Sequence, residues 1–544
     1  MNSILRHLVV LPIVLPLVAG ALLFFLAETS RTARLAVAFA SLLAQCAIAG
    51  SLLYLTSDAA PYIWPDGVGV YDIGGWPAPF GIVLVVDRLT AVMLTLGAIV
   101  ATSTLVYSVA EWDRPGQPFH SLFQFLTMGL NGAFLTGDLF SLFVFFEVLL
   151  AASYGLLLRG ANEPRVNSGF HYITINLAAS LLFLIGVAMI YGMTGTLNMA
   201  DLAGRAAALA PADRPLLDAG AAILGIAFLV KAASWPLNLW LPGAYSAASA
   251  PVAAAFAMMT KVGFYALLRI GTLMREYETL GTALFYIGLL TLITGTIGLL
   301  GAKHLQRTIA FTVLSSMGIL LSTLGLKMES LTAPVLFYLV VSVLTTCMSF
   351  MLAGMTERTR NPEAPASPDI AEDPDEPVYA AYGIKRFTVH EPGQDPGIAI
   401  PAVMAFLGMV FVCCTLLVSG LPPLPGFLAK FALLSTMLQL GAGTATWVLA
   451  ATIVLSGLAA VLSLSRVGMR LFWSITARTT PRLRLLEAAP VAGLVLLCLG
   501  LSVAADPVMR YLDSAARSLH QPDTYIRSVL SQESQREQRG APRP

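Results

Sequence analysis

The stretch GIAFLVKAASWPLNLWLPG (residues 225–243) places a lysine, Lys231, in an otherwise apolar run and a proline, Pro236, five residues later. A charge costs roughly 2.5–3.5 kcal/mol at the centre of a membrane helix, and a proline removes a backbone hydrogen bond from a helix interior. Together they predict a broken helix facing a polar interior. In this interpretation Pro236 frees the carbonyl of Ala232, so that water or a neighbouring side chain can enter beside the lysine.

The composition around this stretch is that of a polytopic membrane protein. Hydrophobic residues make up 57% of the 544 residues and charged residues 12%, whereas soluble domains carry roughly 25% charged residues. Apolar runs of about 20 residues, long enough to span a membrane, recur along almost the whole chain. The formal net charge of +1 argues against a nucleic-acid partner. The first apolar run reaches Ala27 without a clear cleavage site, which favours a retained helix over a signal peptide.

The apolar runs predict fourteen membrane spans. They cover residues 4–26, 33–56, 86–109, 121–137, 139–158, 169–191, 217–240, 249–272, 280–301, 308–327, 332–355, 400–440, 446–471 and 486–506. The twelfth span is too long for one straight crossing, and it contains GLPPLPG (420–426), whose prolines predict a second broken helix with exposed carbonyls. Such a break is tolerated at membrane depth only where protein or water covers the backbone, which favours a polar pathway.

The two predicted breaks lie at corresponding places in the order of spans. Lys231 lies in the fourth helix of the set 4–8 and Lys430 in the fourth helix of the set 9–13, each near a proline interruption. Because five helices is an odd number, the second set would enter the membrane inverted, as in many transporters. The predicted regions are helices 1–3 (1–110), the first five-helix repeat (111–272), the second repeat (273–471), and helix 14 with a polar tail (472–544).

Hydrophilic segments and loop charges complete the predicted topology. Residues 356–398 are rich in proline and acid and predict a flexible loop. The tail at 507–544 predicts an interfacial helix followed by a disordered end, QREQRGAPRP. Most loop lysines and arginines follow odd-numbered spans, so the positive-inside rule places those loops in the cytoplasm and both termini outside. The basic tail opposes this orientation.

Four ionisable residues lie deepest in the apolar runs: Glu147, Lys231, Lys261 and Lys430. If they were unpaired, inserting these four charges into the membrane would cost on the order of 10 kcal/mol in total. We therefore expect them to be hydrated, paired with one another or used in the function of the protein. Lysine suits proton transfer because burial lowers a lysine pKa and a nearby carboxylate raises it, whereas arginine stays charged. The pattern predicts a proton relay in which the approach of Glu147 controls whether Lys231 holds its proton. The alternative is a structural Lys–Glu pair that joins helices.

The remaining polar residues are given structural roles. Asp138 in TGDLF is expected to cap a helix, and Arg269 and Glu487 to be snorkelling or interfacial residues near span ends. His304 is expected on a solvated helix end, with a relay role as the alternative. The five cysteines are expected to be small core residues. The sequence has no nucleotide loop, no haem, iron–sulfur or metal-ligand spacing and no nucleophilic triad, so we predict neither a cofactor nor a metal.

Three long segments resemble one family. They are NGAFLTGDLFSLFVFFEVLLAASYGLLL (131–158), INLAASLLFLIGVAMIYGMTGTLNMADLA (175–203) and VKAASWPLNLWLPGAYSAASAPVAAAFAMMTKVGFYALLR (230–269). They resemble the D-type subunit of Mrp-type sodium/proton antiporters, also called Mnh or Pha, which belong with the antiporter-like subunits of respiratory complex I. The resemblance covers about residues 80–470. It implies an all-α polytopic membrane protein of about 14 transmembrane helices, two inverted five-helix repeats, broken helices 7 and 12, and a central hydrophilic axis.

The resemblance also assigns the ionisable residues. Glu147 and Lys231 match the family's pair, Lys261 its central relay lysine, and Lys430 the terminal lysine of helix 12. One departure is LPGAY in place of the usual LPDAH or LPDSY, so that Gly243 lacks a carboxylate.

A second departure concerns helix 11. The segment FYLVVSVLTTCMSFML (337–352) lacks the histidines and lysine that many relatives carry there, and it has Val341, Ser342 and Thr346 in those places. The link between Lys261 and Lys430 must then use water, Ser/Thr hydroxyls or His304.

The resemblance implies a transporter component and not an enzyme. The expected function is proton translocation in a hetero-oligomeric antiporter of the bacterial inner membrane, with A-, B-, C-, E-, F- and G-type subunits of the Mrp complex as partners and with Na⁺ or another monovalent cation as the exchanged ion. One alternative is a proton-pumping membrane component of a quinone or hydrogenase redox complex. Another is a scaffold whose lysines hold helices together.

Overall fold

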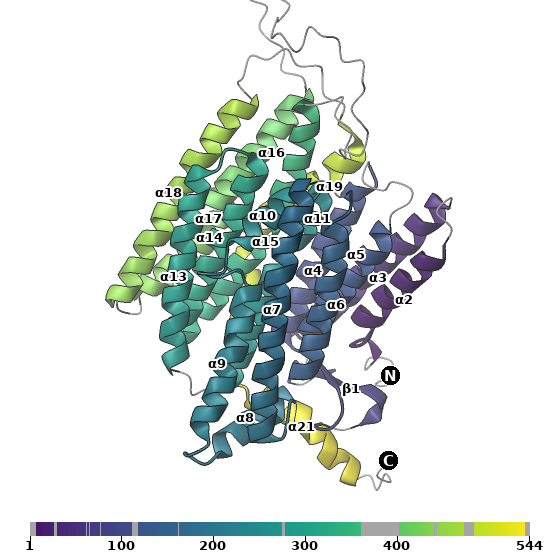
Figure 1. Ribbon diagram of the computed structural model, residues 1–544, viewed down its shortest axis with the longest axis vertical. Helices are drawn as coiled ribbons and strands as arrows, with labels where there is room; N and C mark the ends of the chain where they lie inside the picture. Colours follow the sequence, from purple (N-terminus) through teal and green to yellow (C-terminus); the bar gives the residue numbers. More distant parts are fainter. Residues whose placement is uncertain are drawn as a thin grey trace, which may run out of the picture.

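The computed structural model describes residues 7–26, 30–60, 63–64, 66–76, 78–110, 118–160, 163–274, 278–360, 402–439, 441, 443–472 and 483–538. Its helices run roughly along one long axis and form a single bundle (Figure 1). Within these ranges, eleven helices are long and apolar enough to cross a membrane. The protein is therefore an all-helical, multi-pass membrane protein, as its composition predicts.

The elements follow the predicted spans closely. In chain order they are α2 (Leu11–Phe25), α3 (Arg31–Leu55), β1 (Gly69–Asp72), η1 (Ile73–Gly75), β2 (Val83–Val86), α4 (Arg88–Ser108), α5 (Phe119–Leu135), α6 (Leu139–Leu157), α7 (Glu163–Thr194), α8 (Met199–Ala208), α9 (Arg214–Lys231), α10 (Trp240–Ala247), α11 (Ala250–Ala255), η2 (Phe256–Met258), α12 (Met259–Leu273), α13 (Glu278–Gly301), α14 (Leu305–Gly325), α15 (Glu329–Arg360), α16 (Ala402–Ser419), α17 (Pro425–Gln439), α18 (Thr444–Phe472), α19 (Leu485–Val503), α20 (Ala505–His520) and α21 (Asp523–Gln538).

Both predicted helix breaks are present. The prolines of GLPPLPG separate α16 from α17, and Gly420, with φ of 77°, ends α16. The other break differs in detail from its prediction, because α9 ends at Lys231 itself and Ala233 adopts φ of 53°. The chain has left the helix before it reaches Pro236, so the proline lies in the connecting loop and does not free a carbonyl within a continuing helix.

Several elements were not predicted, among them α8, α10, a 3-10 segment and a pair of strands. The short 3-10 segment η2 interrupts the predicted span 249–272 between α11 and α12. Strands β1 and β2 pair antiparallel ahead of α4, where the run Val83–Val86 is completely buried. β-Branched residues favour such a buried strand, and the Val83 carbonyl also accepts a hydrogen bond from Gly137 N at 2.9 Å.

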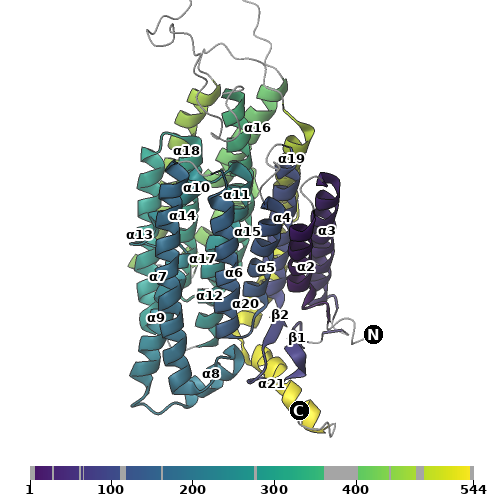
Figure 2. The same cartoon turned by 45° about the vertical axis from the view of Figure 1, so that its right-hand side comes forward.

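The C-terminal segment packs onto the bundle. α20 buries Leu512, Ala515, Ala516 and Leu519 and lies against α4, α12 and α15 (Figure 2). The predicted interfacial helix is thus part of the fold. The predicted disordered end begins inside α21, which continues to Gln538, and residues 539–544 lie outside the described ranges.

The predicted loop 356–398 falls mainly outside the described ranges. α15 continues to Arg360, and residues 361–401 are not among those described. Figure 1 shows α21 at one end of the bundle and the start of α16 at the other. The cytoplasmic or external position of each end stays a prediction.

Candidate functional site

Glu147 on α6 and Lys231 at the end of α9 meet through a third residue, Ser180 on α7. Lys231 Nζ donates a hydrogen bond to Ser180 Oγ at 3.3 Å, and the Ser180 hydroxyl donates to a carboxylate oxygen of Glu147. Among the ion pairs of the described residues, none joins Glu147 and Lys231 directly. A hydroxyl can accept one proton and donate another, so Ser180 is a chemically suitable bridge between the two groups.

The surroundings of Lys231 keep its ammonium away from bulk water. The residue is 5% exposed, and Nζ lies 5.0 Å from the centroid of the Phe146 ring, where the aromatic face attracts a cation. The Ser180 hydroxyl has a second acceptor, the Asn176 carbonyl, at 3.0 Å. Ser180 can therefore release Glu147 without losing its own hydrogen bond.

Lys261 on α12 is the most deeply buried of the three lysines, at 1% exposure. Its Nζ donates to Ser316 Oγ at 3.0 Å and to Met317 Sδ at 3.2 Å, both on α14. No ion pair between described residues includes Lys261. The neutral hydroxyl of Ser316 is thus the principal oxygen partner of this ammonium.

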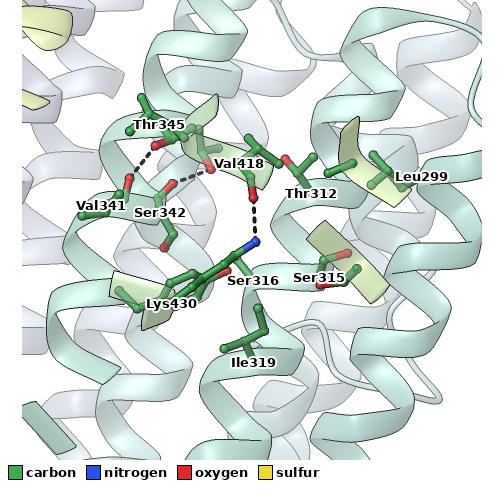
Figure 3. A pocket seen from close by; sticks show the side chains of 15 residues that line it. Leu299, Thr312, Ser315, Ser316, Ile319, Val341, Ser342, Thr345, Val418 and Lys430 are labelled. Atoms are coloured by element: carbon green, nitrogen blue, oxygen red, sulfur yellow. Dashed lines mark hydrogen bonds between the residues drawn. The ribbon is translucent and has the colours of Figure 1, made fainter. Parts of the chain in front are cut away.

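Lys430 on α17 points back onto the end of α16. Its Nζ donates to the carbonyls of Val418 at 2.8 Å and Ser419 at 3.0 Å, as Figure 3 shows for Val418. These are carbonyls that the break exposes, and the negative end of a helix dipole favours a cation there. Gly420 adopts φ of 77°, which favours glycine, and an added Cβ would lie 2.6 Å from Lys430 Cδ, so a side chain there would displace the lysine.

A cavity of about 40 Å³ lies beside Lys430 and has room for about two or three water molecules. We call it the inner chamber. Its hydroxyl-bearing lining residues include Thr312, Ser315, Ser316, Ser342, Thr345, Thr346 and Ser456. Figure 3 shows Ser316 and Lys430 on the wall of this chamber. Ser316 also accepts the hydrogen bond from Lys261, so one residue contacts Lys261 and lines the chamber of Lys430.

Most hydroxyls of the inner chamber donate their proton to a carbonyl of their own helix. Such bonds are made by Thr312, Ser316, Ser342, Thr345, Thr346 and Ser456. The lone pairs of these oxygens remain available to accept hydrogen bonds from water or from an ammonium group. The predicted helix 11 corresponds to α15. Its residues Val341, Ser342 and Thr346, which stand where many relatives carry histidines or lysine, therefore line a hydroxyl-rich cavity.

His304 lies apart from this group. It is exposed at the N-cap position of α14 and lines a second, larger cavity together with Lys303, Arg307, Glu357 and Arg470. The structure does not bring it beside the inner chamber. Of the three links considered from the sequence, Ser/Thr hydroxyls with space for water are the one that the geometry provides between Lys261 and Lys430.

Two predictions about span-end charges were wrong. Arg269 is not interfacial but 5% exposed, and its guanidinium makes two hydrogen bonds to Asp87, at 2.5 and 2.7 Å. Asp87 also caps α4 by accepting from Thr90 N. Glu487 is likewise fully buried. A position near a span end could not reveal that Arg269 meets a carboxylate so distant in sequence.

The roles assigned to Asp138 and to the cysteines were confirmed. Asp138 caps α6 by accepting from Ser141 N at 2.8 Å. The five cysteines are free, and each is buried or half-buried. Sequence reasoning missed Ser180 and Ser316, because a serine in an apolar helix most often bonds to its own backbone and carries no distinguishing signal. Within the described ranges, no group of three or more His, Cys, Asp or Glu side chains could hold a metal ion.

Buried lysines beside two broken helices, with a hydroxyl-lined chamber next to Lys430, are typical of a membrane transporter of the antiporter-like class. Residues 136–367 match the family described as "NADH:quinone oxidoreductase/Mrp antiporter, TM". The probable K(+)/H(+) antiporter D subunit of Rhizobium meliloti is 47% identical over 98% of this chain and 99% of its own length. The chain therefore belongs to the D-type family of Mrp antiporter subunits, which is related to the antiporter-like subunits of complex I.

Two further comparisons agree. The Na(+)/H(+) antiporter D subunit of Alkalihalophilus pseudofirmus is 31% identical over 97% of this chain and 100% of its own. A chain of the solved Mrp complex from Dietzia sp. DQ12-45-1b superposes with a TM-score of 0.78 at 27% identity, covering 96% of this chain and 99% of that one. The similarity thus extends well beyond the segments that carry the motifs.

Proposed function

We propose that this chain is the proton-translocating D-type subunit of a multisubunit monovalent cation/proton antiporter in the bacterial inner membrane. The observation that carries the proposal is the position of Ser316, which accepts a hydrogen bond from Lys261 and also lines the chamber of Lys430. We call this contact the Ser316 bridge. The bridge supplies a continuous polar connection where helix 11 lacks histidines. In the relay, Lys261 passes a proton through the chamber to the neutral amine of Lys430, and the carbonyls of α16 stabilise the resulting ammonium.

The first half of the relay would begin at Glu147. Ser180 accepts from Lys231 and donates to Glu147, so movement of its proton between these partners couples the two charges. α9, which ends at Lys231, packs very closely against α12, which carries Lys261. The evidence is that a Cβ added at Gly263 of α12 would lie 2.7 Å from the Phe228 carbonyl of α9. Protons would thus move in the membrane plane from Glu147 through Lys231 and Lys261 to Lys430.

The finer architecture belongs to the same proposal. Fourteen membrane spans and two inverted five-helix repeats, at 111–272 and 273–471, account for the two interrupted segments. The support is that α9/α10 and α16/α17 are both interrupted beside a buried lysine. The match is not exact, because Lys231 ends the first half-helix whereas Lys430 lies on the second half-helix and reaches back to the first.

The exchanged ion and the partners come from the relatives. Their names specify K⁺ in one case and Na⁺ in another, so we propose export of one of these monovalent cations, driven by proton entry. The partners would be the A-, B-, C-, E-, F- and G-type subunits of an Mrp complex. Each proton that crosses a membrane potential of 100 mV releases roughly 2.3 kcal/mol. This is similar to the roughly 2.5–3.5 kcal/mol that one charge costs at the centre of a membrane helix.

The proposal is tested in everted vesicles from antiporter-deficient bacteria that express the full operon. Na⁺, K⁺ or Li⁺ is added, and collapse of the proton gradient is followed with a pH-sensitive dye. Lys231→Ala should abolish exchange in an assembled complex, whereas Arg510→Ala, at an exposed pair on α20, should not. Normal exchange by Lys231→Ala would contradict the relay. Loss of assembly with each Lys→Ala variant would favour the scaffold interpretation, and flavin or iron–sulfur absorbance in the purified complex would favour a redox complex.

A further inference from the structure

The larger cavity lies at one end of the helix bundle, where α14 begins and where α15 and α18 end. Its volume of about 630 Å³ is within the range of roughly 300–1,000 Å³ that is usual for ligand pockets. All three helices are long and apolar enough to span a membrane. Because the ends of such helices lie at the membrane surface, the cavity lies at the level of the lipid headgroups. We call it the basic pocket.

The charged side chains of the basic pocket are mostly cationic. Lys303, Arg307 and Arg470 line it and are exposed, whereas Glu357 is the single carboxylate among its described lining residues. This carboxylate accepts a hydrogen bond from Gln306 Nε2 at 2.8 Å. Among the ion pairs of the described residues, none includes any of the three cations. The pocket therefore carries positive charge that the described part of the chain does not neutralise.

The position of these cations is unfavourable for the protein alone. Arg307 lies in the first turn of α14, where the helix dipole presents its positive end and where there is no acidic residue. The side chain of the N-cap residue, His304, makes no capping hydrogen bond to this turn. A cation raises the energy of such a helix start, whereas a bound anion lowers it. The cationic cluster is therefore better suited to holding a negatively charged ligand than to stabilising the fold.

An exposed apolar surface leads to the basic pocket along α18. Leu462, which is 52% exposed, is followed at intervals of four residues by Arg466 and Arg470, so the three side chains follow one another along the helix. Arg470 lines the pocket. The Arg466 guanidinium donates to the carbonyl of Leu300 at 2.8 Å, and Leu300, near the end of α13, is itself 40% exposed. Apolar surface of α13 and α18 thus lies directly beside the cations.

This combination distinguishes a lipid from a free anion. Guanidinium groups bind phosphate oxygens with paired hydrogen bonds, and a lysine adds a further positive charge. A free phosphate would contact the cations alone, whereas a phospholipid would also cover the apolar surface. Basic pockets between membrane helices on the cytoplasmic side bind anionic lipid headgroups, and the loop charges predict that this end of the bundle is cytoplasmic.

We propose that the basic pocket binds the phosphate of an anionic phospholipid, which is held by Lys303, Arg307 and Arg470 and lays its acyl chains against the exposed apolar surface of α13 and α18. Because Arg307 belongs to α14 and Arg470 to α18, the bound lipid links these two helices at one end. Both helices line the inner chamber further along their length, so the lipid stabilises the helices around that chamber. This inference does not depend on the relay role of Lys430.

The first test is photocrosslinking in the purified, delipidated complex. The probe is phosphatidylglycerol that carries a photoreactive diazirine in one acyl chain, and phosphatidylcholine with the same chain is the zwitterionic control. Labelled peptides are identified by mass spectrometry after irradiation. We expect phosphatidylglycerol to label α13 and α18 in about tenfold excess over phosphatidylcholine, because the pocket attracts net negative charge. Equal labelling by the two probes, or labelling confined to other helices, would overturn the proposal.

The second test removes the three cations. The triple variant Lys303→Gln, Arg307→Gln and Arg470→Gln should lower phosphatidylglycerol labelling of α18 about tenfold, whereas Lys303→Arg, Arg307→Lys and Arg470→Lys together should retain most of it. The matched control for general loss of positive charge is Arg510→Gln with Arg517→Gln, at exposed positions of α20. Unchanged labelling in the neutral triple variant would overturn the proposal. If that variant does not assemble, Arg470→Gln alone decides by the same comparison.

The third test separates a lipid from a soluble anion. The melting temperature of the delipidated complex is measured with phosphatidylglycerol, with phosphatidylcholine and with sodium phosphate at the same ionic strength. We expect a rise with phosphatidylglycerol that the neutral triple variant loses, and no comparable rise with phosphatidylcholine or phosphate. An equal rise with inorganic phosphate would overturn the lipid assignment in favour of a soluble anion.

Discussion

Ser316→Ala is the substitution that most directly tests the connection between the two deepest lysines. It removes the oxygen that accepts from Lys261 Nζ at 3.0 Å and leaves Met317 Sδ at 3.2 Å. A hydrogen bond to a charged group contributes about 1.5–3 kcal/mol. The lower end applies here, because the sulfur remains as a weak acceptor. At 1.4 kcal/mol per factor of ten, the state with an ammonium at Lys261 becomes about tenfold less populated.

The assay is the initial rate of gradient collapse in everted vesicles at matched levels of assembled complex. We expect about a tenfold lower rate for Ser316→Ala and near-normal exchange for Ser316→Thr, which keeps the hydroxyl. Ser322→Ala is the matched control, because this buried serine of the same helix donates only to carbonyls of α14. A rate for Ser316→Ala within twofold of wild type would refute the bridge.

Three further predictions concern stability; the first is measured as the amount of assembled complex that can be purified, and the other two as the melting temperature of the purified complex. Gly426→Ala should prevent stable assembly, since its Cβ would lie 2.2 Å from the carbonyl oxygen of Leu417 and backbone must move to relieve the clash. Asp87→Asn should destabilise the complex by on the order of 3 kcal/mol, because Arg269 becomes a buried charge without its ionic partner. Burial lowers the pKa of His520 from 6.5, and Glu329 opposes the shift only in part. The neutral histidine therefore contributes stability that is present above pH 6.5 and lost as pH falls through the lowered pKa, so His520→Gln should show a smaller loss of melting temperature between about pH 7.5 and 5.5.

Matched controls separate these effects from general damage. Gly408→Ala lies on α16, where a Cβ would meet no atom within 4 Å, and it should assemble normally. Asp58→Asn alters an ion pair with Arg88 in which the Asp58 side chain is 75% exposed, and it should change the melting temperature far less than Asp87→Asn. Equal effects in the control and the test variant would remove the structural basis of the corresponding prediction.

The sequence predicts the membrane spans and both broken helices because hydrophobic length and proline act locally. The four deep charges were found for the same reason, since Glu147 and the three lysines stand out in apolar runs. What could not be predicted depends on contacts between distant segments. Ser180 and Ser316 become bridges only when α7 and α14 lie beside the lysine-bearing helices.

Arg269 shows how a local rule can mislead. Its place near a span end suggested a side chain that reaches toward the membrane surface, yet a carboxylate at the N-cap of α4 holds it inside the bundle. The carboxylate could be read as a helix cap from the sequence, but its pairing with a residue 182 positions away could not. The partner of a buried charge depends on how the helices pack against one another, and the prediction of membrane spans carries no information about that packing.

The docking of α20 has a consequence for how the protein is made. This helix lies against α4, α12 and α15, and it bonds to Thr56 through Tyr511 and to Thr332 through His520, each at 2.8 Å. All of these partners leave the ribosome before α20 does. The bundle consequently receives its closing contacts late in synthesis, so a chain terminated before Ala505 would enter the membrane with its spans but without the segment that ties them together.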